Sequence, residues 1–186
     1  MPTDYLRDLV SLIAVISFVI FIVAIYLPRM KHRVASPLRD FFKNGTAALE
    51  TLIFLMLYAI LFYTLFFFPD AALSPSLAAP GSLLALAGLV LALIGRLTLR
   101  KHWRPVTNPG KPDVLLTSGI FRYLRHPIYA GRILFFMGVM LMFASPLVIL
   151  TIVYWYTLRM KARREEHLLT GLPGYAEYRQ RVFSPF

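Results

Sequence analysis

The chain has 186 residues, enough for one domain, and 58% of them are hydrophobic, whereas a soluble globular domain has about half. A globule of this size cannot bury so much apolar surface, so a bilayer is the expected solvent. No cysteine is present, which excludes a disulfide framework, and the basic residues behind the net charge of +11 cluster between apolar segments, as at a membrane surface rather than on a nucleic-acid-binding face.

Three apolar segments make up the N-terminal half. The run Leu9–Leu27 is uncharged and long enough for a bilayer core, and the basic stretch after it argues against a cleaved signal peptide. Further membrane helices are predicted over Thr46–Phe68 and Gly81–Leu99. Small residues recur at helical spacing in the last of these, which predicts a face that another helix approaches closely. They are Ala85, Gly88, Ala92 and Gly95.

The segment Ile133–Leu158 is uncharged but interrupted at Ala144-Ser145-Pro146. It is too long for one typical span, so we expect a tight helical hairpin with Arg132 and Arg159 at its two ends on the same side. One long, kinked helix is the alternative. The polar tail that follows predicts a helix through Leu169 and, after a Gly- and Pro-rich break, a short helix through Arg181.

Lysine and arginine predict the topology. Nearly all of them lie in the loop after the first segment, in the loop after the third, and in the C-terminal tail. The positive-inside rule then places the N-terminus outside, the tail in the cytoplasm and five spans between them. The expected fold is an all-α integral membrane protein of one domain, residues 1–186. Residues 1–99 would form three N-terminal helices, and residues 100–186 would form the core that carries the chemistry.

A polar stretch runs directly into the hairpin and holds the first candidate residues. Proline has no N–H group and favours the first turn of a helix, so Pro127 places His126 just before a helix N-terminus, where unpaired backbone donors attract anions. This histidine either caps the helix at the membrane interface or binds a cofactor. A metal ion is not expected, because no other histidine stands at ligand spacing and cysteine is absent.

The second set of candidates lies in the tail. Glu165 and Glu166 stand out in an acid-poor chain, and neighbours on a helix point about 100° apart, so the two face different partners. They either form local ion pairs in a solvated tail or belong to a binding site. Tyr129, Tyr175 and Tyr178 either form an interfacial aromatic belt or line the same site.

Two motifs in these segments resemble a known signature. The first is Gly119-x-x-Arg122 followed by Arg125-His126-Pro127-x-Tyr129-x-Gly131. The second is Glu165-Glu166-x-x-Leu169 followed by Gly174-Tyr175-x-x-Tyr178-x-x-Arg181-Val182. Together they resemble the isoprenylcysteine carboxyl methyltransferase and phospholipid methyltransferase superfamily over about Leu97 to Phe186. Leu172-Pro173-Gly174 departs from the usual Phe-Gly-acid pattern, which leaves the substrate less certain than the cofactor.

The resemblance implies an integral membrane enzyme that uses S-adenosylmethionine. The cofactor would bind on the cytosolic side, between the two motifs, and a lipophilic or prenylated substrate would reach it from the membrane lipid; no nucleic acid is implied. Arg125 and Arg163 would orient an anionic acceptor, and Glu166 would join them at the reacting centre. The implied cofactor-binding residues are His126, Pro127, Tyr129, Gly131, Glu165, Glu166, Tyr175 and Tyr178.

Four functions remain open at this point. The expected one is methyl transfer most like isoprenylcysteine carboxyl O-methylation, and the first alternative is N-methylation of a phospholipid amine, which would need Glu166 or His126 as a base. An NADPH-dependent sterol-type reductase is disfavoured because Ile128 and Arg132 stand where its related motif has Asn and Glu. A non-catalytic membrane scaffold would not need the two motifs to face each other.

Overall fold

The computed structural model describes residues 45–67, 76–99, 115–143 and 148–186, together with six isolated positions before residue 20. That part of the chain is helical, as predicted, and holds one isolated parallel bridge, between Leu124 and Phe183. The predicted first span, Leu9–Leu27, falls outside the described residues except at isolated positions. The elements are α3 (Gly45–Phe67), α4 (Ala78–Leu99), η1 (Gly119–Arg122), α5 (Pro127–Met142), α6 (Ile149–Leu169) and α7 (Tyr175–Arg181).

The predicted helices that fall within the described residues agree with the observed ones, with small shifts of boundary. Helix α3 differs from its prediction by one residue at each end, and the short helix through Arg181 is α7. Helix α4 begins at Ala78, earlier than the predicted Gly81. The helix can start there because Pro80 then lies in the first turn, where a missing backbone N–H breaks no hydrogen bond.

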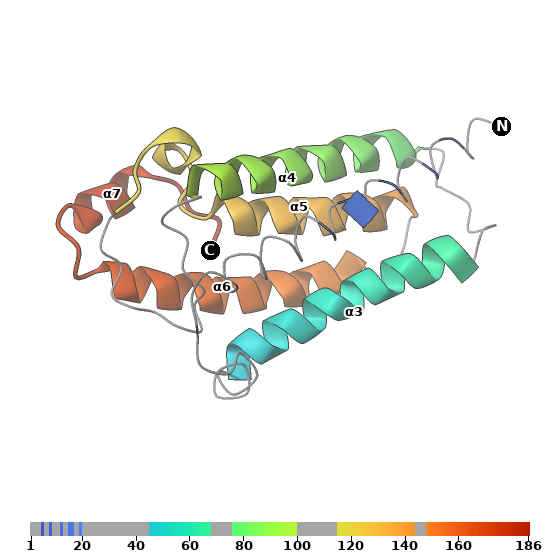
Figure 1. Ribbon diagram of the computed structural model, residues 1–186, viewed down its shortest axis with the longest axis horizontal. Helices are drawn as coiled ribbons and strands as arrows, with labels where there is room; N and C mark the ends of the chain where they lie inside the picture. The colour runs from blue at the N-terminus through green and yellow to red at the C-terminus, as the bar shows by residue number, and fades with distance from the viewer. Residues whose placement is uncertain are drawn as a thin grey trace.

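Helices α5 and α6 form the predicted antiparallel hairpin, and the single kinked helix is wrong. The Tyr129 hydroxyl near the start of α5 donates to Glu165 near the end of α6. Further along α5, the ring of Phe136 lies 5.8 Å from that of Tyr154 in the first half of α6. The start of α5 thus contacts the end of α6, and a later position of α5 contacts an earlier position of α6. The two helices are therefore antiparallel, as Figure 1 shows.

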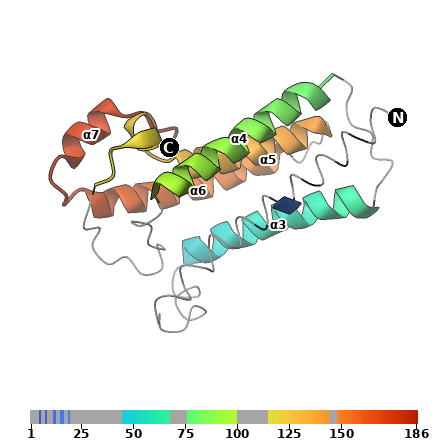
Figure 2. The same ribbon diagram turned by 45° about the horizontal axis from the view of Figure 1, so that its top comes forward.

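Helix α4 packs against α5 through glycine, as the stripe of small residues predicts. A Cβ on Gly88 would lie 2.4 Å from the backbone nitrogen of Phe135, and one on Gly138 would lie 2.4 Å from that of Ala85. From the other side, a Cβ on Gly131 would lie 2.5 Å from the carbonyl oxygen of Gly88. The two backbones therefore run side by side along their length, as both views show (Figures 1 and 2).

An aromatic cluster joins α3 to the hairpin and encloses an arginine. Phe54 and Tyr58 of α3 contact Phe136 of α5 edge to face, with ring centroids 5.7 and 5.0 Å apart. Arg132 is 7% exposed, and its guanidinium lies 4.6 Å from the ring centroid of Phe54 and 5.2 Å from that of Tyr154. The expectation that Arg132 marks a hairpin end is wrong, because α5 begins at Pro127 and brings this position into the bundle.

The outward faces of the helices are aliphatic, the reverse of a soluble bundle. Leu83 and Leu97 of α4 are 69% and 65% exposed, whereas the glycines of the same helix are buried. Apolar surface of this extent calls for a nonaqueous partner. Among the described residues, α4 is long and apolar enough to cross a membrane, and α5 is apolar but shorter. Five spans and their orientation stay predictions.

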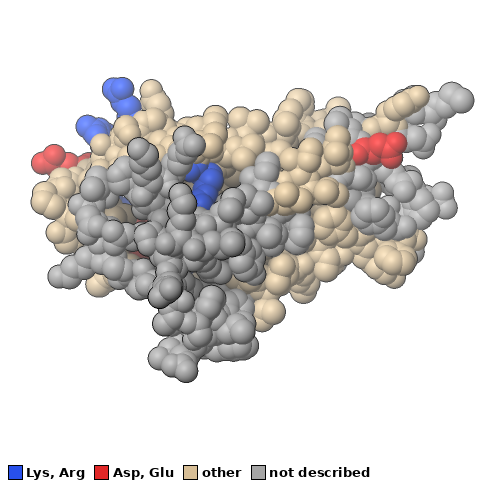
Figure 3. Space-filling model, in the orientation of Figure 1, with Lys and Arg blue, Asp and Glu red and all other residues tan. Residues whose placement is uncertain are grey.

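The visible basic side chains gather at one end of the molecule. On the face drawn in Figure 3, the described basic side chains that are visible lie in the half that carries α7, and the surface over the middle of the helices is mainly uncharged. Helix α6 links the two regions, because its first half is apolar and its second half, from Arg159 onward, is polar. The candidate residues lie at this charged end.

Candidate active site

The start of α5 fixes the first motif in place. His126 is the N-cap residue of α5 and Pro127 occupies the first turn, as predicted. The peptide just before them is held by the tail, because the Arg125 backbone N–H donates to the Phe183 carbonyl at 3.0 Å. The imidazole of His126 is buried, with 7% of the side chain exposed.

Glu166 of α6 joins the two motifs. Its Oε1 accepts from the Arg125 guanidinium at 2.7 Å and lies 2.9 Å from Nε2 of His126, while its Oε2 lies 3.8 Å from Nε of Arg179. Burial alone would raise the pKa of Glu166, but the hydrogen bond and charge of His126 and the two guanidinium groups outweigh it and hold that pKa below its usual value. The carboxylate is therefore ionised at neutral pH.

The side chain of Glu165 points in a different direction from that of Glu166, because adjacent positions on a helix are about 100° apart. It accepts a hydrogen bond from Tyr129, whose ring stacks on His126 with centroids 5.6 Å apart and planes 5° from parallel. The ammonium of Lys161 lies 5.3 Å from the centroid of the Tyr129 ring, so that ring already has a cation beside it. Phe186 meets the His126 and Tyr129 rings edge-on.

The tail that carries Phe186 is anchored to the hairpin. The indole N–H of Trp155 in α6 donates to the Pro185 carbonyl at 3.1 Å. Together with the bridge between Leu124 and Phe183, this bond holds the tail beside the His126 and Tyr129 rings. The tail thereby covers one side of the cluster.

The two tyrosines of α7, Tyr175 and Tyr178, lie near Arg125 of the first motif. The Tyr178 hydroxyl donates to the Phe121 carbonyl at 2.8 Å, and burial raises the pKa of Tyr178 to about 12. Burial also raises the pKa of Tyr175, and the nearby Glu166 carboxylate adds to the effect, while the Arg125 guanidinium opposes it. Both phenol hydroxyls are therefore protonated at pH 7 and can donate hydrogen bonds.

Three predicted residues lie apart from this cluster. Gly131 faces α4, where it allows the close helix contact, and Pro127 packs against Gly95 of the same helix. Arg163 is exposed and takes no part in the contacts between described residues that build the cluster. Sequence reasoning missed Arg179 and Phe186. Arg179 stands one helical turn after Tyr175, a spacing that could have indicated it, whereas no pattern marks Phe186.

The cluster suits a cationic small molecule that also carries hydrogen-bonding groups. Carboxylates and aromatic faces both stabilise a sulfonium or ammonium group, and Glu165, Tyr129 and Phe186 offer them side by side. The charge of Glu166 is already matched by Arg125, so Glu165 is the more available carboxylate. Within the described ranges, no group of three or more His, Asp and Glu side chains is arranged to hold a metal ion.

Comparison with known proteins gives consistent matches. The family model for phospholipid methyltransferase matches residues 77–172, just over half of the chain. Protein-S-isoprenylcysteine O-methyltransferase of Rattus norvegicus is 29% identical over 122 residues, which is 62% of this chain and 43% of that protein. Protein-S-isoprenylcysteine O-methyltransferase B of Arabidopsis thaliana is 33% identical over 72 residues, 37% of this chain and 36% of that protein.

A solved structure has the same fold. It is that of the eukaryotic intramembrane Ras methyltransferase, isoprenylcysteine carboxyl methyltransferase, with a TM-score of 0.60 and 25% sequence identity over 75% of this chain. The match covers 52% of that protein. The chain thus spans about two fifths of the length of the curated relatives it matches and about half of the solved one.

Proposed function

Because the chain belongs to the phospholipid methyltransferase family, we propose that it transfers a methyl group from S-adenosylmethionine to a lipophilic substrate at the cytosolic membrane face. The reaction most like it is isoprenylcysteine carboxyl O-methylation, which the names of its relatives describe. The proposed site is the cluster of His126, Tyr129, Glu165, Glu166, Tyr175 and Tyr178, with Arg125 beside it.

One observation carries the proposal. His126 and Glu166 are 40 positions apart in the chain, yet Nε2 of one lies 2.9 Å from Oε1 of the other. The two motifs that the resemblance pairs therefore meet at one place, so a single small molecule can touch both. A scaffold would not need this convergence of a buried histidine, two carboxylates and three tyrosines.

Each residue has a role that its contacts support. Bound S-adenosylmethionine supplies a methyl group on a positively charged sulfur, which leaves without help from a general acid. Glu165 and the Tyr129 ring would hold positive charge, and Phe186 would exclude water from the reacting centre. Arg125, fixed by Glu166, would orient an anionic acceptor in line with the donor.

The charge state of Glu166 favours a carboxylate acceptor over an amine. An amine must lose a proton before or during transfer, and its base should have a pKa near the working pH. Glu166 has a lowered pKa and lies against Arg125 and His126, so it is a poor proton acceptor. A carboxylate acceptor needs no base. The phospholipid amine remains the second candidate because the matching family is described as phospholipid methyltransferase.

Ligand binding tests the reaction class. Isothermal titration of the detergent-purified chain should detect S-adenosylhomocysteine and no NADPH. Glu165→Gln should weaken S-adenosylhomocysteine binding about tenfold, the effect of losing one charge-assisted contact, while Glu177→Gln on the exposed face of α7 should not. NADPH binding without S-adenosylhomocysteine binding would replace the proposal with a reductase, and binding of neither would favour a scaffold.

Product analysis tests the acceptor. Incubation with isotope-labelled S-adenosylmethionine and either a prenylated cysteine or phosphatidylethanolamine, followed by mass spectrometry, should label the prenylated cysteine as a base-labile methyl ester. A base-stable label on the lipid amine would instead support the second candidate.

A further inference from the structure

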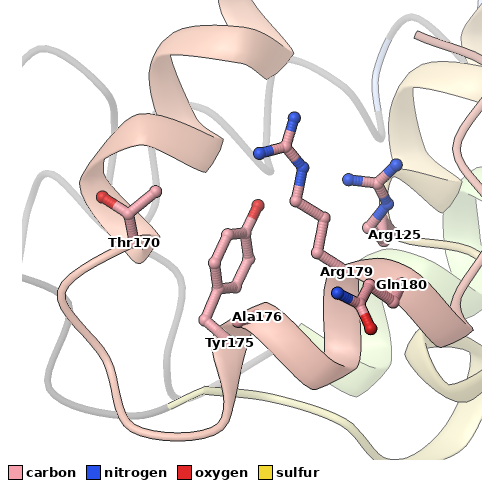
Figure 4. Close-up of a pocket in the computed structure, with 6 residues that line it drawn as sticks. All are labelled: Arg125, Thr170, Tyr175, Ala176, Arg179 and Gln180. Carbon is pink, nitrogen blue, oxygen red and sulfur yellow. The ribbon is translucent and has the colours of Figure 1, made fainter.

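A cavity of about 430 Å³ opens beside the cluster, on the side of Glu166 that faces α7. Its volume falls in the range of small-molecule sites, which is roughly 300 to 1,000 Å³. Figure 4 shows its walls, which come from the end of α6, from α7 and from the segment before α5. The lining residues are Arg125, Thr170, Tyr175, Ala176, Arg179 and Gln180.

The walls carry positive charge and hydrogen-bond donors. Arg125 and Arg179 both line the cavity, and the described residues that line it include no acidic side chain. Glu166, which contacts both guanidinium groups, offsets only one of the two charges. The amide of Gln180 adds a further donor.

Two buried donors at this cavity lack a hydrogen-bond partner among the described residues. The Tyr175 residue is 3% exposed, and its hydroxyl makes no hydrogen bond of acceptable geometry to a described residue, although Arg125 lies close by. In Figure 4 this hydroxyl points between Thr170 and the two guanidinium groups. The Nε of Arg125 is likewise buried without a hydrogen bond among the described residues. Buried donors are normally satisfied, so the arrangement is that of a site built for an acceptor.

We propose that this cavity binds an oxyanion, a carboxylate or phosphate group, between the guanidinium groups of Arg125 and Arg179 and the hydroxyl of Tyr175. Guanidinium forks match the paired oxygens of either group, and the unbalanced positive charge favours one negative charge. The oxyanion belongs either to the amino-acid end of the methyl donor or to the headgroup of an anionic lipid. The first source rests on the proposed function, whereas the second does not.

Two variants test the site. Arg179→Gln removes one charge from a largely exposed side chain, and Tyr175→Phe removes only the hydroxyl. Arg181→Gln is the matched control, because Arg181 is exposed on the same helix and does not line the cavity. All three are measured in the full-length, detergent-purified chain, with thermal unfolding as the check on folding. Should Tyr175→Phe fail to fold, Arg179→Gln decides alone.

Four probes separate the sources of the oxyanion. S-adenosylhomocysteine carries a carboxylate and 5′-methylthioadenosine lacks it, while vesicles of phosphatidylglycerol and phosphatidylcholine differ in headgroup charge. If the donor is the source, both variants bind S-adenosylhomocysteine about tenfold more weakly and bind 5′-methylthioadenosine unchanged. If a lipid is the source, both lose the preference for phosphatidylglycerol over phosphatidylcholine.

The outcomes keep this inference apart from the proposed function. A chain that binds no S-adenosylhomocysteine but whose preference for phosphatidylglycerol depends on Arg179 would sink the proposed function and support the oxyanion site. A chain that binds S-adenosylhomocysteine equally well with Arg179→Gln, Tyr175→Phe and Arg181→Gln, and that shows no change in lipid preference, overturns the oxyanion site and leaves the proposed function standing.

Discussion

The ion pair between Glu166 and Arg125 ties the stability of the fold to pH. The folded-state pKa of Glu166 lies below its ordinary value of 4.5, because His126 and two arginines outweigh the effect of burial. A depressed pKa means that the ionised carboxylate stabilises the folded state above the unfolded pKa. That stabilisation is lost as the pH falls below about 4.5 and through the folded pKa.

Glu166→Gln should therefore make the unfolding temperature depend less on pH in the acid range. The wild-type chain should unfold at a higher temperature than the variant at pH 7, and the difference should shrink as the pH falls below about 4.5. Thermal unfolding in detergent, followed by circular dichroism, measures both. Glu177→Gln is the control, and a difference between wild type and Glu166→Gln that is constant across this range would contradict the assignment.

Tyr178→Phe should destabilise the fold. The hydroxyl of Tyr178 is the donor to the buried Phe121 carbonyl, and removing it leaves that acceptor unsatisfied, at a cost of about 1 to 3 kcal/mol. Tyr123→Phe removes the same atom from a side chain that is 68% exposed and should cost nothing measurable. Equal unfolding temperatures for the two variants would show that the bond contributes little.

The contact between α4 and α5 depends on glycine at the level of the element. The backbones approach so closely that a methyl group at Gly88, Gly131 or Gly138 would meet backbone atoms at 2.4 to 2.6 Å, which no side-chain movement can relieve. The helices would have to separate, and the start of α5 carries His126. The packing of these two helices and the geometry of the cluster are therefore linked.

Gly138→Ala should lower the free energy of unfolding by roughly 1 to 3 kcal/mol, the usual cost of overpacking. Gly171→Ala is the control, because a Cβ at Gly171 would meet nothing within 4 Å. Unfolding temperatures and the monodispersity of the detergent-purified protein report the difference. A Gly138→Ala protein as stable as Gly171→Ala would mean that α4 and α5 can shift apart freely.

Much of this element-level organisation was predictable from the sequence, because it rests on periodic or local signals. Helical spacing of small residues indicated the α4 face, and Pro127 indicated the start of α5. The burial of Arg132 was not predictable, since it depends on Phe54 of a distant helix lying opposite. The same holds for Arg179 and Phe186, whose partners are set by how the tail folds back rather than by any repeat.

At the scale of the whole molecule, the visible basic side chains lie toward one end and the exposed apolar surface lies along the helices. The exposed leucines of α4 call for lipid, whereas the described basic side chains seen in Figure 3 gather toward the α7 end. A chain with this distribution would place its basic end in the cytoplasm. The candidate site would then lie where a membrane-embedded acceptor can meet a water-soluble donor.

Labelling of introduced cysteines tests this orientation, and the natural chain offers no background because it has no cysteine. Glu177→Cys on α7 should react with a membrane-impermeant maleimide only after the cells are opened. Ser76→Cys, in the connection before α4 that is predicted to lie outside, should react in intact cells. Both positions are exposed, so the reverse pattern of labelling would mean that the chain inserts the other way round.

The hydrogen bond from Trp155 to the Pro185 carbonyl makes this indole an intrinsic fluorescence probe of the tail. Indole emission responds to the partner of its N–H group, and Trp155 is one of only two tryptophans in the chain. Trp103→Phe would leave it as the only tryptophan. Its spectrum would then register, without any attached dye, whether the peptide around Phe186 stays docked or swings away when a ligand arrives.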